Sequence, residues 1–449
     1  MSPTSSLLRL SGAVFLALAV MLSTAPAQAA TRVTPGNFTG YAFDKCQAPT
    51  QEQMDTWLET SPYWGIGIYL AGINRFCIDH PLLTPEWIAE QSAKKWRILP
   101  LTLGLQASCT ERPRYQKKGR RISAEVTGDF ARARSQGRTE ARSTVAAARS
   151  VGIAEQSTLW YDLEHFPVTN TRCRESALGF LSGWTWQLHE LNYRSGVYSS
   201  ASSGIKALDD ARVTSPGRWN LPDQLWIAEW MAAKDYTRPP TATPPSLLSG
   251  YLRDDGWMPN DRMRQYRGGH NETYGGVTFN IDSNYMRLGR GSVPGRARSD
   301  CGVRIDFGDY KYRAPGGEGK LVAAAQCFLR KRHHYSGQIT GQYDEATRRA
   351  VVDFQVAHQI PARGAMTRRT WSALMSAGGT PLLKYGAGSN AVRRLQRALN
   401  AVDAAGLPIS GVFDWPTTAA VKRYQRDHGL ADTGVVLDQT WGLLQAGVL

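Results

Sequence analysis

Five acidic residues of this sequence lie at or just after strand-like runs of apolar residues. They are Asp44, Asp162, Glu164, Glu229 and Asp282. A single carboxylate at the end of a strand is ordinary loop chemistry, but five at one rim of a barrel would converge on one cleft. Hydrolysis of a glycosidic bond needs a proton donor and a second carboxylate, which such a set could supply.

The spacing Asp162-x-Glu164 is the strongest indication of a catalytic site in the sequence. Residues two apart on a strand point to the same face, with α-carbons about 6.6 Å apart at a rise of about 3.3 Å per residue. Like charges this close raise the pKa of one carboxyl, which can then keep a proton at neutral pH. The pair therefore predicts a general acid and a partner carboxylate in one cleft.

Aromatic residues lie at or near the ends of the same strand-like runs, where a ring could stack on a sugar. The candidates are Tyr69, Tyr161, Tyr198, Trp226, Trp230 and Tyr266. The alternative for half of them is that they fill the barrel, because inward positions of barrel strands carry bulky side chains. They are consistent with a sugar cleft and do not establish one.

The elements that would position these residues alternate between strand-like and helix-like patterns over 36–290, the sign of successive βα units. The strand-like runs are 40–43, 65–70, 98–103, 158–163, 195–198, 225–230, 264–266 and 277–281. The clearest helices are expected at 138–151 and 175–191. Eight strands in about 255 residues is the size of one barrel. We therefore predict an α/β fold, a (β/α)8 TIM-like barrel.

The C-terminal third repeats itself without a gap, with 316–378 matching 386–448. Each copy predicts three short helices, so we expect two small all-α modules at 301–379 and 380–449, after a linker at 291–300. The aromatic residues of the repeat are expected in the module cores and not at a ligand. These are Phe354, Tyr424, Trp371 and Trp441.

Motifs in both parts resemble known families. The repeats carry Val-x-x-Leu-Gln, Gly-x-Phe-Asp-x-x-Thr, Val-x-x-Phe-Gln and Thr-Trp patterns and resemble the peptidoglycan-binding domain 1 family. The barrel is similar to glycoside hydrolase family 25 lysozymes, and more closely to the glycoside-hydrolase-like domain of unknown function in exported actinobacterial proteins. The motifs that carry this likeness are Asp44, Asp162-x-Glu164, Trp226-Ile227-Ala228 and Asp282-x-Asn284.

The resemblance implies roles for the site residues. Glu164 would be the general acid, and Asp162 would orient or stabilise the substrate N-acetyl group or the cation. Asp44 and Asp282 would position them. Substrate contacts are expected from Tyr69, Tyr198, Trp226, Glu229, Tyr266 and Asn284, although Glu229 stands where lysozymes more often have a nearby Tyr. No cofactor is implied, and we expect no metal site, because Cys-x-x-Cys and His-x-x-x-His spacings are missing from the sequence.

The N-terminus predicts export. Arg9 precedes an apolar run at 12–22, and Ala27-Gln28-Ala29 fits a signal peptidase site, so 1–29 is expected to be a signal peptide. The run is too short for a membrane span, which needs about 20 residues. We expect a monomer that is secreted, extracellular or associated with the cell wall.

The charge balance predicts an anionic partner. Lys and Arg number 53 against 38 Asp and Glu, a net charge of +15. Outside the cytoplasm the expected partner is peptidoglycan or another wall glycan, with anionic wall polymers beside it, and not nucleic acid. Residues 112–142 hold ten basic and three acidic residues. This segment is either a solvated flexible loop or a contact with such a polymer.

Six cysteines in an exported chain predict disulfides. The four in the barrel allow three pairings, of which neighbouring loops favour Cys46 with Cys77 and Cys109 with Cys173. Cys301 and Cys327 are expected to staple the small first module.

Together these features predict a wall-directed protein that cleaves β-1,4 bonds of peptidoglycan while its modules anchor it. The alternative is a catalytically inactive protein that binds peptidoglycan or organises the cell envelope. The intact carboxylate set favours the enzyme.

Overall fold

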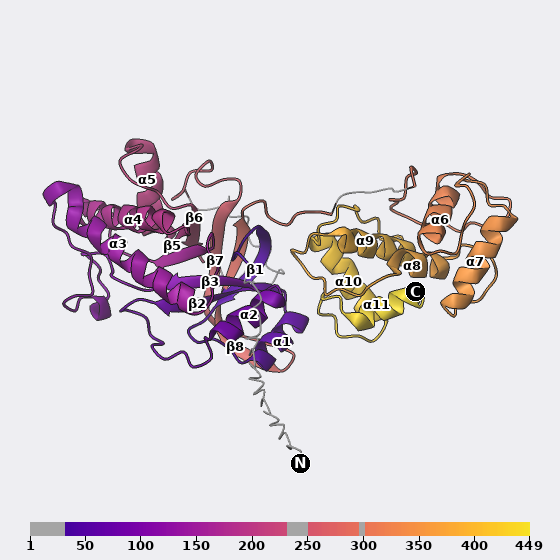
Figure 1. Cartoon of the computed structure of the whole chain (residues 1–449), viewed down its shortest axis with the longest axis horizontal. Coiled ribbons are helices and arrows are strands. Elements are labelled where there is room, and N and C mark those ends of the chain that lie inside the picture. The colour runs from indigo at the N-terminus through magenta and orange to yellow at the C-terminus, as the bar shows by residue number, and fades with distance from the viewer. Residues whose placement is uncertain (1–31, 231–249, 296–300) are drawn as a thin grey trace, which may run out of the picture.

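The computed structural model describes residues 32–230, 250–295 and 301–449. The predicted signal peptide and part of the predicted linker lie outside the described residues. Figure 1 shows a barrel with its covering helices, followed by a separate group of short helices that ends with the C-terminus. None of the described helices is long and apolar enough to cross a membrane.

Eight strands close into a barrel in chain order. They are β1 (Phe38–Asp44), β2 (Tyr63–Ala71), β3 (Arg97–Thr102), β4 (Thr158–Asp162), β5 (Arg194–Ser200), β6 (Gln224–Ala228), β7 (Asp261–Tyr274) and β8 (Val277–Leu288). All eight predicted strands are present, which confirms the predicted barrel. The first seven run parallel to one another.

The last strand departs from a strict (β/α)8 order. β8 runs antiparallel to both β7 and β1. The chain turns back after β7 at Gly275 and Gly276, whose φ angles are 56° and 81°. A two-residue turn of this kind joins antiparallel strands, whereas parallel strands need a crossover of a dozen or more residues.

Five helices connect the first six strands. They are α1 (Gln51–Thr60), α2 (Pro85–Ala93), α3 (Thr127–Ser150), α4 (Thr171–Glu190) and α5 (Lys206–Thr214). The predicted helices at 138–151 and 175–191 correspond to α3 and α4, to within one residue at their C-terminal ends. These two helices pack so closely that a Cβ atom added at Gly137 of α3 would lie 2.0 Å from the carbonyl oxygen of Phe180 on α4. Only a glycine fits at this contact. Between β6 and β7 the described residues contain no helix.

The two C-terminal modules each contain three helices, as predicted. The first holds α6 (Lys320–Lys331), α7 (Glu345–Ala357) and α8 (Arg368–Ser376), and the second holds α9 (Asn390–Asp403), α10 (Trp415–Asp427) and α11 (Asp438–Gln445). One continuous apolar core runs through both modules. All four aromatic residues expected in the module cores are buried.

The repeated glutamines of the modules are structural. Gln326 Nε2 donates to the carbonyl oxygen of Gln342 at 2.9 Å, and its Oε1 accepts from the backbone N–H of Gly341. Gln396 makes the same contacts in the second copy with Val412 and Gly411. These buried amides satisfy the loop backbone, which explains why the pattern recurs in both copies.

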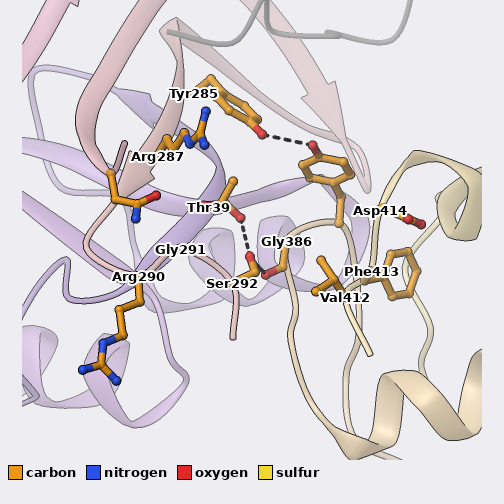
Figure 2. A pocket seen from close by; sticks show the side chains of 12 residues that line it. Thr39, Tyr285, Arg287, Arg290, Gly291, Ser292, Gly386, Val412, Phe413 and Asp414 are labelled. Carbon is orange, nitrogen blue, oxygen red and sulfur yellow. Dashed lines mark hydrogen bonds between the residues drawn. The ribbon is translucent and has the colours of Figure 1, made fainter. Parts of the chain in front are cut away.

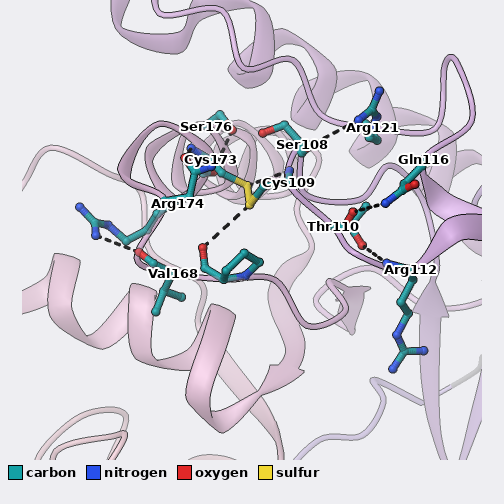
Figure 3. The surroundings of a disulfide bond; sticks show 12 residues. Ser108, Cys109, Thr110, Arg112, Gln116, Arg121, Val168, Cys173, Arg174 and Ser176 are labelled. Atoms are coloured by element: carbon teal, nitrogen blue, oxygen red, sulfur yellow. Dashed lines mark hydrogen bonds between the residues drawn. A yellow bond between two sulfur atoms is a disulfide. The ribbon is translucent and has the colours of Figure 1, made fainter.

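Three disulfides match the pairings expected from the sequence. They join Cys46 to Cys77, Cys109 to Cys173 and Cys301 to Cys327. The second links the loop after β3 to the start of α4, and Figure 3 shows Arg112 on the same loop as Cys109. This disulfide therefore anchors the basic loop beside the barrel rim.

Candidate active site

Two acidic residues face each other across the seam between β1 and β8. Asp44 and Asp282 are paired in the strand register. Asp282 does not end a strand, as the sequence predicted, but lies inside β8. The reversed direction of β8 brings it to the rim where β1 ends.

Asp44 and Asp282 form a carboxyl pair that buried amides connect. Asn284 Nδ2 donates to Asp44 Oδ1 at 2.6 Å, and Gln265 Nε2 lies 3.4 Å from the same oxygen and 3.3 Å from Asp282 Oδ2. Burial and the nearby Asp282 raise the pKa of Asp44 well above its ordinary value. Burial also raises the pKa of Asp282, against the backbone N–H of Gly269, which lowers it. Burial therefore favours the neutral form most strongly at Asp44, the more deeply buried member.

Asp162 and Glu164 form a second pair at the end of β4. Asp162 is 1% exposed, and the Tyr69 hydroxyl donates to its Oδ2 at 3.1 Å. Burial and the charge of Glu164 raise the pKa of Asp162 well above its ordinary value. Gln106 holds the backbone around both acids, donating to the carbonyl oxygen of Asp162 and accepting from the N–H of Glu164, each at 2.8 Å.

Glu164 is the more accessible member of its pair. Its side chain is 19% exposed and forms an ion pair with Arg112, with 3.2 Å between Nη2 and Oε2. The hydroxyl of Tyr115 lies 3.5 Å from the other carboxylate oxygen. Both partners come from the basic loop after β3, so this loop reaches into the site.

A cavity of about 470 Å3 opens beside the Asp44 and Asp282 pair. Asp44, Asp282 and Tyr69 line it, together with Lys45 and Phe76. Tyr198 also reaches the site, because its hydroxyl donates to Gln265 Oε1 at 3.0 Å. The arrangement places buried carboxyls with raised pKa values next to more accessible acids, the pairing that acid–base chemistry needs.

Family comparisons agree with these features. The model for the "Rv2525c-like, glycoside hydrolase-like domain" matches residues 55–286, just over half of the chain. The chain belongs to this family. A peptidoglycan-binding domain model matches residues 318–374 and 388–444, one match in each module. Comparison with curated proteins gives no significant match.

Several solved structures are similar to the Rv2525c-like domain. The Mycobacterium tuberculosis Tat-secreted protein Rv2525c in complex with L-tartrate is 16% identical over 55% of this chain and 95% of that chain, with a TM-score of 0.35. A family 25 glycosyl hydrolase from Bacillus anthracis is 15% identical over 56% and 89%, with a TM-score of 0.33. The Clostridium perfringens spore cortex lytic enzyme SleM is 15% identical over 55% and 67%, with a TM-score of 0.35.

The protein therefore combines a glycoside hydrolase-like domain with two peptidoglycan-binding modules. Cell-wall glycan is the binding partner that the modules indicate. Three disulfides together with these modules place the chain outside the cytoplasm.

Three residues that were predicted to contact the substrate do not line the cavity of the Rv2525c-like domain. Trp226 is fully buried inside the barrel, where its Nε1 donates to Asn284 Oδ1 at 2.7 Å. Asn284 is fully buried too, so both residues support Asp44 from below. Tyr266 lies on the outer face of the sheet, buried against Tyr41. Barrel strands bury both faces, so the sequence pattern could not tell which way these rings point.

Glu229, predicted as a further substrate contact, lies at the end of β6. Its side chain is 13% exposed and its Oε2 is 3.9 Å from Arg264 Nη2. Trp230, the next residue, is 64% exposed and donates to Gln265 Oε1 at 3.2 Å. An exposed ring therefore flanks the carboxylates at this strand end.

The sequence did not reveal several residues that build the site of the Rv2525c-like domain. Gln106 and Gln265 are buried amides, and an isolated Gln carries no recognisable spacing. Glu140, on α3, is a half-buried acid whose pKa is raised to about 7 by its burial. It lies close to Gly104, where an added Cβ would approach its Oε2 to 2.4 Å. In the sequence, Glu140 lies in a helical run rich in Ala and Arg, where it looks like one more surface charge.

The basic loop is folded and not a freely solvated segment. Arg120 Nη1 donates to the carbonyl oxygen of Ile73 at 2.9 Å, and Arg114 bonds to that of Asn74. The Arg114 guanidinium also stacks 3.4 Å from the ring centre of Phe76. Several of the charges thus hold the neighbouring loop after β2, and contact with a wall polymer stays a prediction for the others.

Proposed function

We propose that the barrel hydrolyses β-1,4-glycosidic bonds of peptidoglycan. The observation that carries the proposal is the presence of two carboxyl pairs at one rim, Asp44 with Asp282 and Asp162 with Glu164. Each pair has a deeply buried member with a raised pKa and a member that is less buried. Glycoside hydrolysis needs an acid and a second carboxylate on opposite sides of the bond, and two such pairs can supply both.

The accessible members are the proposed reacting groups. Glu164 is the general acid that protonates the glycosidic oxygen, and Asp282 is the carboxylate that faces the developing cation. Asp162 and Asp44 are positioning groups behind them whose raised pKa values favour the neutral form, so that Asp282 carries the negative charge of the cleft. Tyr69 and Tyr198 hold this arrangement through their hydroxyl groups and border the sugar site.

Arg112 must leave Glu164 before this chemistry can begin. The guanidinium occupies the carboxylate oxygens that have to reach the glycosidic oxygen. We propose that the bound glycan displaces Arg112 and takes its place beside Glu164. The half-exposed position of Arg112 is compatible with this movement, because its side chain is 55% exposed.

The second candidate is a catalytically inactive protein that binds peptidoglycan and organises the envelope. The same Arg112–Glu164 ion pair favours it, because Arg112 occupies the carboxylate of the proposed acid in this structure. In both cases the modules hold the barrel close to the wall, where tethering raises the local concentration of glycan. We propose that the protein is secreted and stays associated with the wall.

The experiment that separates the candidates identifies new glycan ends. Purified peptidoglycan is incubated with the protein, reduced with borohydride and analysed by mass spectrometry. New reduced N-acetylmuramic acid ends support the proposed reaction, and reduced N-acetylglucosamine ends would assign the other glycan bond. Wall binding without any new ends would support the inactive protein.

A further inference from the structure

The second module is docked onto the base of the barrel. Lys384, which precedes α9, is 1% exposed, and its Nζ donates to the carbonyl oxygens of Leu58 at 2.7 Å and Ser61 at 3.1 Å. The ammonium also lies 4.7 Å from the ring centre of Trp64 and 5.4 Å from that of Trp96. A buried lysine is costly unless its donors are satisfied, so these contacts make the docking specific.

The neighbouring residue extends the same contact. Trp64 Nε1 donates to the carbonyl oxygen of Tyr385 at 2.9 Å, and the Tyr385 ring packs 5.0 Å from that of Tyr41. Its hydroxyl lies 3.2 Å from that of Tyr285 on β8. Gly386 follows, where an added Cβ would lie 2.4 Å from the carbonyl oxygen of Thr39.

The first module lacks this docking surface. At the equivalent positions of the repeat, Ala314 and Pro315 stand where the second module has Lys384 and Tyr385. Neither residue can donate a side-chain hydrogen bond to the barrel. The docked position is therefore a property of the second module, and the repeat itself provides a matched control.

Docking creates a pocket of about 370 Å3 between barrel and module. Figure 2 shows Arg287 on the barrel side and Asp414 on the module side, with Thr39 and Ser292 between them. This volume falls in the range of about 300–1,000 Å3 that is usual for small-molecule sites. Thr39 pairs with Arg287 in the strand register, five residues before the Asp44 and Asp282 pair. The pocket thus lies about 16 Å along the strand from the candidate active site.

The charges of the pocket indicate the class of ligand. Arg287 and Arg290 line it, and across the described residues neither side chain has a carboxylate within 4 Å. A guanidinium binds a carboxylate through two parallel hydrogen bonds. On the opposite wall Asp414 caps α10, where its Oδ1 accepts from the backbone N–H and the hydroxyl of Thr417, so its Oδ2 is the oxygen left to accept a hydroxyl or amide N–H of a ligand and to repel a second negative charge. Tyr285 offers a ring beside the same space.

We infer that this pocket binds a saccharide that carries one carboxylate. The acidic group lies against Arg287, and the hydroxyl and amide groups of the sugar face Asp414. Because the pocket has walls from both parts, the ligand also strengthens the docking of the second module. The inference is independent of whether the barrel hydrolyses glycan.

The test measures sugar binding to the full exported chain by calorimetry. N-Acetylmuramic acid is the probe, and N-acetylglucosamine is the neutral control that lacks the carboxylate. Wild type should bind the acidic sugar at least about tenfold more tightly than the neutral one, and Arg287→Gln should remove about that factor. Arg349→Gln, an exposed arginine of the first module, should bind as wild type does.

A double variant tests the role of docking. Lys384→Ala with Tyr385→Pro copies the first module and should abolish binding although Arg287 is intact. Circular dichroism and thermal melting report whether this variant is folded. Since Arg287→Gln leaves the docking contacts unchanged, it decides the question even if the double variant unfolds. Equal affinity for the two sugars, or unchanged affinity in Arg287→Gln, would overturn the inference.

Discussion

Arg112 and Glu164 form an ion pair across the mouth of the candidate active site, with 3.2 Å between Nη2 and Oε2. Arg112 belongs to the loop after β3, and Glu164 follows β4. The contact therefore joins the most basic segment of the sequence to its proposed general acid. It means that the loop controls both access to Glu164 and the charge around it.

Replacing Arg112 by Gln should increase glycan cleavage at pH 7 several-fold. The guanidinium occupies the carboxylate of Glu164, which the glycosidic oxygen must reach, and an uncharged amide at this position would hold the carboxylate less strongly. Stability should change by less than about 1 kcal/mol, because the pair is partly exposed. Initial rates on purified peptidoglycan and urea unfolding measure the two effects. Arg132→Gln, in a pair with Glu125 on the same basic segment, is the matched control. A rate below that of wild type would contradict the proposed role.

Glu140 should make the stability of the barrel depend on pH. Burial raises its pKa to about 7, so the folded state binds its proton more tightly than the unfolded chain does. This contribution to stability is complete at acid pH and is lost as pH rises through 7. Between pH 4 and pH 9, the free energy of unfolding of Glu140→Gln should therefore rise by about 3 kcal/mol relative to that of wild type. Urea unfolding across this range measures the difference. Parallel curves for the two proteins would show that Glu140 ionises normally.

The Cys109–Cys173 disulfide should support both stability and the site. It closes a loop of 64 residues, for which the chain-entropy estimate is roughly 4 kcal/mol. The double variant Cys109→Ser with Cys173→Ser should lower the melting temperature and release the loop that carries Arg112. Differential scanning calorimetry tests the first effect. The double serine variant of Cys301 and Cys327 is the control, because it should destabilise the two modules, which share one core, more than it destabilises the barrel.

The fold could be predicted from the sequence except for the direction of one strand. Most of the strands contain a short apolar run bounded by polar residues, so their positions were recognisable. β7 was predicted only at 264–266, yet it continues through polar residues to Tyr274. Because the second half of β7 is polar, the Gly275–Gly276 turn was not recognised as the turn of a β-hairpin. The antiparallel pairing of β8 was therefore not predicted.

The acidic residues of the site could be predicted from the sequence, whereas the residues that hold them in place could not. Asp44, Asp162, Glu164 and Asp282 stood out because carboxylates near strand ends are chemically distinctive. Gln265 binds two of them but follows no motif, since a buried amide is defined only by what surrounds it. The contacts of Lys384 join the second module to the first helix of the barrel, segments near opposite ends of the chain, so no local pattern could reveal them.

The most direct test of the central claim is the release of reducing ends from purified peptidoglycan by wild type and Glu164→Gln, measured from pH 4 to pH 8. Glu155→Gln, on the loop before β4 at the base of the barrel, is the control for a lost carboxylate. The proposed mechanism predicts release by wild type and by the control, and a rate at least about 100-fold lower in Glu164→Gln. Equal release from all three proteins, or no release from wild type at any pH, would contradict it.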